Sequence, residues 1–416
     1  MRTTPLAACA LVLLSSAAYT SQLAAQSGSP KIFTDFTLID GSGGPAVRNA
    51  WMVVQDGRVT SVGDDSRTHS PVPAERISLA GKTVIPGLIN AHGHINDATR
   101  DLRVYAAYGV TTVFSLGGET APTFAARESQ SVASLNRARV FVSGPVLTPR
   151  TPEEARTQVA GVAAQKVDFV KIRVDDNLGT TQKMPPEVYR AVIEEAHRLG
   201  LRVAVHLFYL SDAKAVLDAG ADLIAHSVRD LDVDAQVIAA LKAKGICLSP
   251  TLMREVSTFV YEGTPDFFSD PLFLAYSDTQ QVNTLRQPAR QQAMRGSASA
   301  QRYKVALEVA SRNVKKLFDA GIPIAMGTDT GPAGRFQGYF ELMELELMVK
   351  AGLTPAQALA AATGVAARCM KVDRDLGTLT AGKWADFVVL DADPTADIRN
   401  VKRISSVWIA GNKVVR

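Results

Sequence analysis

The chain has 416 residues, of which 46% are hydrophobic and 21% are charged. This is the composition of an ordinary globular protein, and the length suffices for one large domain with an accessory domain. The formal net charge of +4 is small for this length, and no dense Lys/Arg tract occurs. The composition therefore gives no reason to expect a nucleic-acid partner.

The N-terminal segment, residues 1–25, is typical of a cleavable signal peptide. A short basic start precedes an apolar stretch over residues 6–14, and small residues lead to a predicted cleavage after Ala25. The apolar stretch is too short to span a bilayer comfortably. We therefore expect an exported protein, periplasmic or secreted, without a stable membrane anchor. An uncleaved anchor is the disfavoured alternative.

Only Cys247 and Cys369 remain after that cleavage. Two cysteines do not make a disulfide framework, and both lie in apolar sequence. We therefore expect two buried free thiols.

Strand patterns occupy both ends of the mature chain. Residues 51–54 and 59–62 flank an Asp-Gly turn, which is typical of a hairpin. Residues 386–390 form a strand-like run, and residues 407–415 resemble a second hairpin around Gly411-Asn412. The simplest arrangement joins residues 31–83 and 375–416 in one composite β-sandwich domain, with the middle of the chain inserted between them.

The middle of the chain, residues 84–374, alternates between apolar strand-like runs and helical patterns. Helices are predicted over residues 186–199 and 302–320, and each is followed by a glycine. Eight strands alternating with helices indicate an α/β fold with a parallel sheet closed into a (β/α)8 TIM barrel. An open doubly wound sheet is the alternative, but no G-x-G-x-x-G motif follows the first strand. The eight predicted strands cover residues 84–89, 111–116, 139–143, 168–174, 202–208, 223–228, 247–252 and 322–326.

The connection over residues 251–300 is unusually long and contains six aromatic residues between positions 259 and 276. Long loops in compact domains are usually functional or disordered. This one follows the seventh predicted strand, on the face where barrel enzymes hold their active sites. A lid or substrate wall is one hypothesis, and the equally weighted alternative is a contact in a homo-oligomer, which is the assembly that we expect.

The strongest chemical signal is the pair His92 and His94. In an extended strand, residues i and i+2 point to the same face, so both imidazoles can face one metal ion. The chain has six histidines, and the two others at predicted strand ends are His206 and His226. The remaining pair, residues 69 and 197, lie in a polar loop and near a helix C-terminus, and we interpret them as structural.

Two further polar residues accompany these strand ends. Lys171 lies within an apolar strand, where a lysine is costly unless it is paired or modified. Asp329 follows the eighth predicted strand. Because the carboxyl ends of barrel strands meet at one face, these residues and the four histidines are predicted to share a site.

In these elements the chain resembles the amidohydrolase superfamily. The resemblance extends over nearly the whole mature chain and is nearest to the imidazolonepropionase-related, prolidase-like branch. That branch includes exported Xaa-Pro-type carboxypeptidases and ochratoxin-hydrolysing amidohydrolases. The matching segments are residues 86–94, 169–172, 206, 225–227, 327–329 and 376–386.

The resemblance implies a site for two divalent metal ions, for which zinc is the default. His92, His94 and Asp329 would hold the more buried ion, and His206 and His226 the second. Lys171, carboxylated on its side-chain nitrogen, would bridge both. A metal-bridging hydroxide would attack an amide carbonyl, and Asp329 would serve first as general base and then as general acid.

The resemblance also implies a small-molecule or short-peptide substrate, either a peptide or N-acyl amino acid with a free carboxylate or an aryl amide of the ochratoxin type. Prolidase-like relatives carry a substrate-binding histidine after the third strand, but residues 143–150 contain none. Tyr209, Arg229 and Arg335 are the candidates for contacting the substrate. For each arginine, a surface salt bridge is the competing interpretation. Arg173 lies on the same strand face as Lys171, and it has the same two interpretations, a substrate contact or a structural residue.

Two other functions stay open. A cyclic-amide hydrolase of the imidazolonepropionase type would use one metal ion and lack the bridging lysine. A barrel that binds a metal or small ligand without turnover would lack a catalytic residue, whereas all six metal-site positions are filled here. A metal count separates the two enzymatic interpretations.

Overall fold

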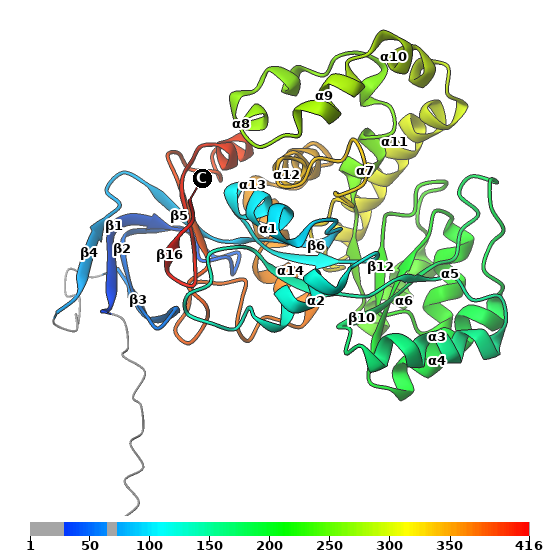
Figure 1. Cartoon of the computed structure of the whole chain (residues 1–416), viewed down its shortest axis with the longest axis horizontal. Coiled ribbons are helices and arrows are strands. Elements are labelled where there is room, and N and C mark those ends of the chain that lie inside the picture. Colours follow the sequence, from blue (N-terminus) through cyan, green and yellow to red (C-terminus); the bar gives the residue numbers. More distant parts are fainter. Residues whose placement is uncertain (1–28, 65–72, 416) are drawn as a thin grey trace, which may run out of the picture.

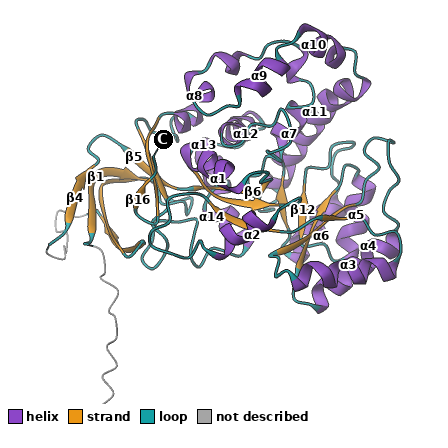
Figure 2. Ribbon diagram, in the orientation of Figure 1, coloured by secondary structure: helices purple, strands orange, loops and turns teal. Residues whose placement is uncertain are grey.

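The computed structural model describes residues 29–64 and 73–415. In Figures 1 and 2, long strands from both ends of the chain lie on one side, and helices surround shorter strands on the other. The signal peptide predicted over residues 1–25 lies outside the described residues, so export stays a prediction.

Strands from both ends form one eight-stranded mixed sheet. Its order is β16-β15-β14-β5-β1-β2-β3, and β4 pairs in parallel with β1. Because β5 pairs with both β1 and β14, it joins the N-terminal strands to the C-terminal ones. The second layer of the predicted sandwich is not shown by these pairings. The strands are β1 Lys31–Leu38, β2 Val47–Gln55, β3 Arg58–Gly63, β4 Glu75–Ser78, β5 Thr83–Pro86, β14 Phe387–Leu390, β15 Ile404–Ile409 and β16 Asn412–Lys413.

Both predicted hairpins are present in this sheet. The β2–β3 turn lies at Asp56-Gly57, where both residues have positive φ, as a tight two-residue hairpin turn requires. The β15–β16 turn lies at Ala410-Gly411, one residue before the predicted position.

The parallel strands predicted for the middle of the chain form two sheets, β6-β7-β8 and β13-β12-β11-β10-β9. The eighth predicted strand is present only as a parallel bridge between Ile324 and Leu248. These pairings show a mixed α/β fold, and they do not by themselves show a closed barrel. The strands are β6 Leu88–Gly93, β7 Val110–Ser115, β8 Arg139–Val142, β9 Val146–Leu147, β10 Phe169–Arg173, β11 Arg202–His206, β12 Leu223–Ala225 and β13 Cys247–Ser249.

The first strand predicted for the middle, residues 84–89, is divided at Gly87. Residues before the glycine belong to β5 in the terminal sheet, and residues after it begin β6. A Cβ atom at Gly87 would lie 2.0 Å from Oγ1 of Thr111, so only glycine fits where the chain passes between the two sheets.

The helices lie between the parallel strands and over them (Figure 1). None of the helices within residues 29–64 and 73–415 combines the length and apolarity needed to cross a membrane. They are α1 Ala98–Ala107, α2 Ala121–Glu128, α3 Pro152–Ala164, α4 Pro186–Arg198, α5 Leu210–Ala219, α6 Ala235–Lys244, α7 Leu252–Val256, α8 Pro271–Leu274, α9 Thr279–Leu285, α10 Pro288–Arg295, α11 Ala298–Asp319, α12 Tyr339–Lys350, α13 Pro355–Ala361 and α14 Gly364–Met370, with 3-10 helices η1 Val260–Glu262, η2 Asp266–Ser269 and η3 Ile398–Lys402.

The long connection over residues 251–300 folds into the short helices α7 to α10, and α8 to α10 lie at the top of Figure 1. Four of its aromatic side chains are buried, and two of them, Phe267 and Phe273, contact aromatic residues of α12 and the segment before it. The aromatic residues therefore attach this segment to α12. Neither the lid hypothesis nor the oligomer hypothesis is tested by this packing.

The prediction of two free thiols is wrong, because Cys247 and Cys369 form a disulfide. Both side chains are buried, as expected, and the bond ties the start of β13 to α14. The two cysteines are 122 residues apart, so only the tertiary structure brings them to bonding distance.

Candidate metal centre

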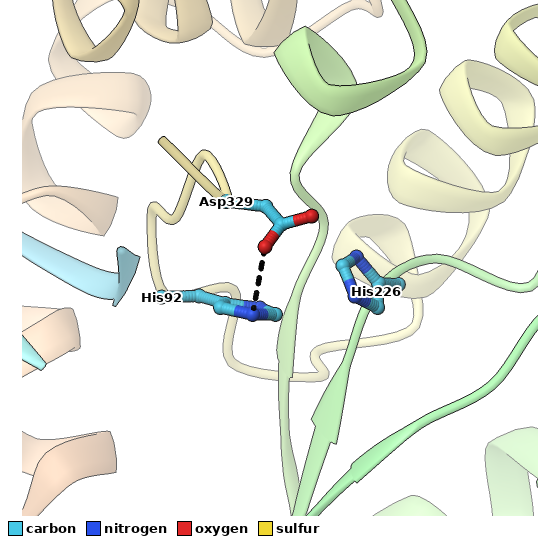
Figure 3. A group of neighbouring side chains, drawn as sticks. All are labelled: His92, His226 and Asp329. Carbon is cyan, nitrogen blue, oxygen red and sulfur yellow. Dashed lines mark ion pairs between the residues drawn. The ribbon is translucent and has the colours of Figure 1, made fainter. Parts of the chain in front are cut away.

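The six residues predicted to share a site lie at or near the carboxyl ends of the parallel strands. His92 is in β6 and His94 follows it, whereas His206 is the last residue of β11 and His226 follows β12 directly. Ligand atoms of His92, His226 and Asp329 all lie within 4.8 Å of one another. Figure 3 shows these three side chains converging from separate parts of the chain.

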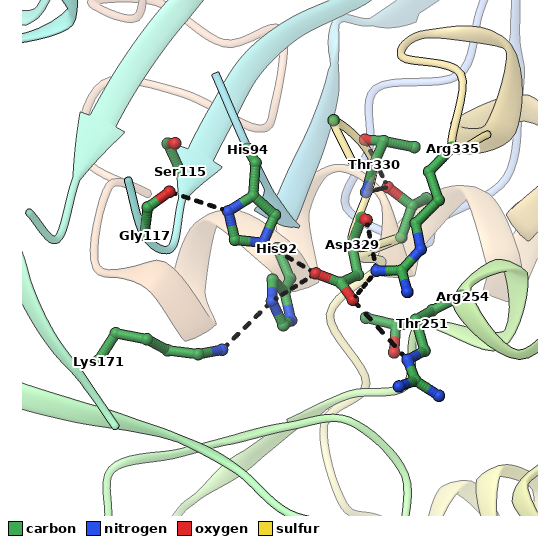
Figure 4. A network of polar contacts seen from close by, with 12 residues as sticks. His92, His94, Ser115, Gly117, Lys171, Thr251, Arg254, Asp329, Thr330 and Arg335 are labelled. Atoms are coloured by element: carbon green, nitrogen blue, oxygen red, sulfur yellow. Dashed lines mark hydrogen bonds and ion pairs between the residues drawn. The ribbon is translucent and has the colours of Figure 1, made fainter. Parts of the chain in front are cut away.

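The other three residues complete the same cluster. His94 Nε2 lies 2.8 Å from Asp329 Oδ1, and Lys171 Nζ lies 3.2 Å from Nε2 of His92 (Figure 4). The ring centroid of His206 is 4.1 Å from that of His226. The structure therefore brings all six predicted residues together.

Three of the histidines use one ring nitrogen for a partner outside the cluster. Nδ1 of His94 donates to the carbonyl of Gly117 at 3.0 Å, and Nδ1 of His226 lies 2.6 Å from Oγ1 of Thr251. Nε2 of His206 lies 3.0 Å from Oδ2 of Asp175. Such partners fix the tautomer. The opposite nitrogen of His94 contacts Asp329 Oδ1 within the cluster, whereas that of His226 has no partner among the described residues.

The free nitrogen is visible as an unsatisfied group at His226. Its Nε2 is buried and has no hydrogen-bond partner among the described residues. A buried polar atom without a partner is costly unless an ion or another group satisfies it. Imidazole nitrogens and a carboxylate oxygen are also the ligand set that zinc prefers, so these residues fit a metal ion.

Burial favours the neutral form of His92, His206 and His226. It lowers the pKa of His92 and of His226 well below the ordinary histidine value. For His206, burial outweighs the neighbouring Asp175 carboxylate and lowers the pKa to about 3. Because a metal ligand must offer a lone pair, the neutral form is the one that a metal site requires.

Lys171 and Asp329 are the charged members of the cluster. Burial lowers the pKa of Lys171 to about 7, so much of the amine is neutral near neutral pH. Burial alone would raise the pKa of Asp329, but the Arg335 guanidinium and the His94 hydrogen bond hold it well below its usual range. Asp329 is therefore an ionised carboxylate, with Arg335 on its Oδ2 oxygen.

A buried glutamate on α12 holds two of the strand ends in place. Glu341 Oε1 accepts hydrogen bonds of 2.6 Å from the side chains of Asn90, Thr328 and Thr330. Asn90 Oδ1 in turn accepts the backbone N–H of His92. Glu341 thus fixes His92 and both neighbours of Asp329.

Thr251 has a left-handed backbone, with φ of +54°. This conformation is unusual for a β-branched residue and indicates local strain. The turn is stabilised by Glu344, whose carboxyl oxygens accept the backbone N–H groups of Leu252 and Met253. The strained turn places the Thr251 hydroxyl against His226.

The three predicted substrate contacts lie in different environments. Arg335 reaches Asp329 and is partly exposed. Arg229 is buried, with Nε 3.1 Å from Glu255 Oε1, so its partner is an interior carboxylate and it forms no surface salt bridge. Tyr209 donates its hydroxyl to Oδ1 of Asp176. Of the three, Arg335 alone contacts a predicted metal-site residue.

Sequence reasoning missed several residues of the site. Asp175 lies four positions after Lys171, just beyond β10, so the strand-end rule could have identified it. Arg254 has Nε 3.9 Å from Oδ2 of Asp329 and stacks on Tyr303, whereas Glu341 acts from a helix. No local pattern marks these last two positions.

A cavity of about 730 Å³ lies beside the cluster, between the connections that follow β9 and β10. Arg150, Arg173, Asp175 and Lys183 are among its lining residues. Another cavity, of about 650 Å³, is lined by both cysteines of the Cys247–Cys369 disulfide. None of the six cluster residues lines either cavity. The first cavity approaches the cluster through its lining residue Asp175, whose Oδ2 lies 3.0 Å from Nε2 of His206.

Residues 83–414 match the sequence profile of the Amidohydrolase family, and the chain belongs to this family. The imidazolonepropionase of Streptomyces avermitilis is 24% identical over 400 residues, which span 88% of this chain and 87% of the relative. The ochratoxinase of Aspergillus niger is 27% identical over 281 residues, or 65% of this chain and 51% of the relative.

Solved structures of similar fold cover most of the chain. A putative prolidase from Bifidobacterium longum has a TM-score of 0.77 and 28% identity, over 93% of this chain and 95% of that one. A Xaa-Pro dipeptidase with bound methionine has a TM-score of 0.76 and 20% identity, over 93% of this chain and 100% of that one. The predicted resemblance is confirmed, and the protein is a hydrolase acting on carbon–nitrogen bonds, in a family that uses metal ions.

Proposed function

We propose that the protein is a binuclear metal-dependent hydrolase that cleaves the amide C–N bond of a short peptide or an N-acyl amino acid. The observation that carries the proposal is the convergence of four histidines, Lys171 and an ionised Asp329 at the ends of the parallel strands.

His92, His94 and Asp329 would hold one ion, His206 and His226 the other, and carboxylated Lys171 would bridge them. When bound, two divalent ions, by default zinc, would polarise the substrate carbonyl and acidify a water molecule. The position of Lys171, 3.2 Å from His92, supports the bridge. Its pKa of about 7 supports the carboxylation, because the neutral amine is the form that reacts with CO₂.

Asp329 would move the proton. Its Oδ1 oxygen faces His94, and its Oδ2 oxygen is held by Arg335. An ionised carboxylate in this position accepts the proton of the attacking water and then delivers it to the leaving nitrogen, which is the stronger base. Arg335 keeps the carboxylate ionised and fixed in orientation until that transfer.

A free carboxylate on the substrate is supported by the arginines beside the site. Arg335 is partly exposed at Asp329, and Arg150 and Arg173 line the adjoining cavity of about 730 Å³. Guanidinium groups bind carboxylates with two parallel hydrogen bonds. The prolidase and dipeptidase names of similar structures agree with such a substrate. Aryl amides of the ochratoxin type remain a second possible group of substrates, in line with the ochratoxinase relative.

We also infer that residues 84–374 form a closed (β/α)8 barrel and that residues 31–83 and 375–416 form a composite β-sandwich domain. Closure is supported by hydrogen bonds from Ala325 to Leu248 and from Ala91 to Met326, each 2.8 Å long. These bonds connect β13 and β6 through the segment of the eighth predicted strand.

We further propose that the protein is exported and acts on small molecules as a homo-oligomer. The Cys247–Cys369 disulfide supports export, because such bonds persist in oxidising compartments. Oligomerisation is carried over from the sequence-based expectation alone.

The cyclic-amide hydrolase with one metal ion is the second candidate, since imidazolonepropionases are among the relatives. The two candidates differ in substrate. The test is a screen of the zinc-loaded protein against dipeptides and N-acyl amino acids, each paired with its α-carboxamide. We expect release of the amine from the free acids only. Equal rates on both members of each pair, or turnover of cyclic amides alone, would contradict the proposal.

A further inference from the structure

Asp175 lies in the connection after β10, with its side chain almost completely buried against His206. The distance from Asp175 Oδ2 to His206 Nε2 is 3.0 Å. Nε2 makes no hydrogen bond of ordinary geometry, so the pair is in ion-pair contact. Because an ionised carboxylate can only accept a hydrogen bond, this contact favours the tautomer with its proton on Nε2. The ring nitrogen that remains free is Nδ1.

The other oxygen of Asp175 is anchored separately. Oδ1 accepts hydrogen bonds from Nε of Arg173 at 2.8 Å and from the backbone N–H of Asn177 at 3.0 Å. Arg173 and His206 are paired residues in the parallel β10–β11 ladder, so both lie at the same level of the sheet. The carboxylate therefore has one oxygen fixed by the protein and one directed at the histidine.

Asp175 is also the more buried member of its pair with Arg173. The Arg173 side chain is 33% exposed and lines the adjoining cavity, whereas that of Asp175 is 1% exposed. An electrostatic contact shielded in this way is stronger than the same contact in water.

We propose that Asp175 is a positioning residue for the second metal ion, holding His206 as the Nε2–H tautomer so that Nδ1 faces the ion. This inference rests on the proposed function. The corresponding partners of His94 and His226 are a backbone carbonyl and a hydroxyl. Asp175 alone among these three partners carries a charge, which raises the basicity of the ligand it orients. Arg173 then acts through Asp175.

The test compares zinc binding by the wild-type protein and three variants, using competition titration to separate the tighter ion from the weaker one. Asp175→Ala should weaken the second ion by roughly 10-fold to 100-fold while leaving the first nearly unchanged. The affinity of Asp175→Asn for the second zinc ion should lie between those of the wild type and Asp175→Ala, because the amide oxygen of asparagine can still accept a hydrogen bond. Asp176→Asn removes the charge of the neighbouring residue and should leave both zinc affinities unchanged.

A second readout does not depend on metal. With ¹⁵N-labelled histidine, NMR of the metal-free protein reports the tautomer of each ring. His206 should be protonated at Nε2 in the wild type and should lose this preference in Asp175→Ala. His197, whose Nε2 lies 2.9 Å from Asp222 on the surface, serves as an internal reference for an Asp–His pair.

Three results would overturn the inference. These are an Nδ1–H tautomer at His206 in the wild type, unchanged affinity for both ions in Asp175→Ala, or an equal loss of both ions together with a lower melting temperature. The last result would give Asp175 a general structural role. If the wild type binds a single ion, the proposed function fails on stoichiometry, while the tautomer still decides whether Asp175 orients His206.

Discussion

Removal of the Glu341 carboxylate tests how the fold holds the candidate site. In Glu341→Ala, the side chains of Asn90, Thr328 and Thr330 lose their shared acceptor inside the protein. A buried donor left without a partner costs about 1–3 kcal/mol. The two threonine hydroxyls lie 3.0 Å apart and can pair with each other, so the full cost of three donors is not reached.

Burying the Glu341 carboxylate also costs free energy, and Glu341→Ala eliminates this cost. Burial raises the pKa of Glu341, and its Oε2 oxygen has no hydrogen-bond partner among the described residues. We therefore expect Glu341→Ala to lower the free energy of unfolding by about 2–4 kcal/mol. Glu341→Gln keeps an acceptor at Oε1 and should cost less than Glu341→Ala by at least about 1 kcal/mol.

The assay is urea unfolding followed by far-UV circular dichroism, with zinc content measured in parallel. Glu346→Ala is the matched control, because Glu346 lies on the same helix and its side chain, which is 29% exposed, pairs with Lys402. The free energy of unfolding of Glu346→Ala should be lower than that of the wild type by no more than about 1 kcal/mol. If Glu341→Ala unfolds at the same urea concentration as Glu346→Ala and keeps its zinc, the network around Glu341 does not support the site.

Three further predictions concern the disulfide, a buried acid and the proton carrier. Replacing both Cys247 and Cys369 by alanine should lower the free energy of unfolding by about 2–5 kcal/mol, and added reductant should then shift only the wild type in the same urea assay. Burial raises the pKa of Glu344 to about 8. Its contribution to the free energy of unfolding is therefore complete below the ordinary pKa of a glutamate and is lost as pH rises through about 8. Urea unfolding from about pH 5 to about pH 9 should show the wild type losing stability relative to Glu344→Gln, and parallel pH profiles would contradict this shift. Asp329→Asn should retain zinc but lose turnover by about 10²-fold to 10⁴-fold, measured as initial rates on the best substrate of the screen, and near-normal rates would exclude proton transfer by Asp329.

The positions of the central strands and the clustering of the candidate site residues were predictable because they depend on local pattern. Apolar runs marked seven of the eight central strands, and histidines at strand ends marked the cluster. Residues 322–326 match the same pattern but form only a bridge to β13, since extended sequence does not by itself secure a full ladder of hydrogen bonds.

The features that sequence reasoning missed depend on contacts between distant segments. The Cys247–Cys369 bond joins residues 122 positions apart, and Glu341 reaches Asn90 from a helix near the other end of the chain. The division of the first central strand at Gly87 depends on how closely Thr111 approaches. Such pairings follow from packing, which no local pattern of one sequence encodes.

The central claim, a binuclear metal centre, is tested most directly by counting metal ions. The purified protein is dialysed against zinc, then against metal-free buffer, and its zinc content is measured by mass spectrometry together with the protein concentration. The account predicts about two ions per chain, falling to about one or fewer in Lys171→Ala. One ion per chain in the wild type, unchanged by Lys171→Ala, would contradict it.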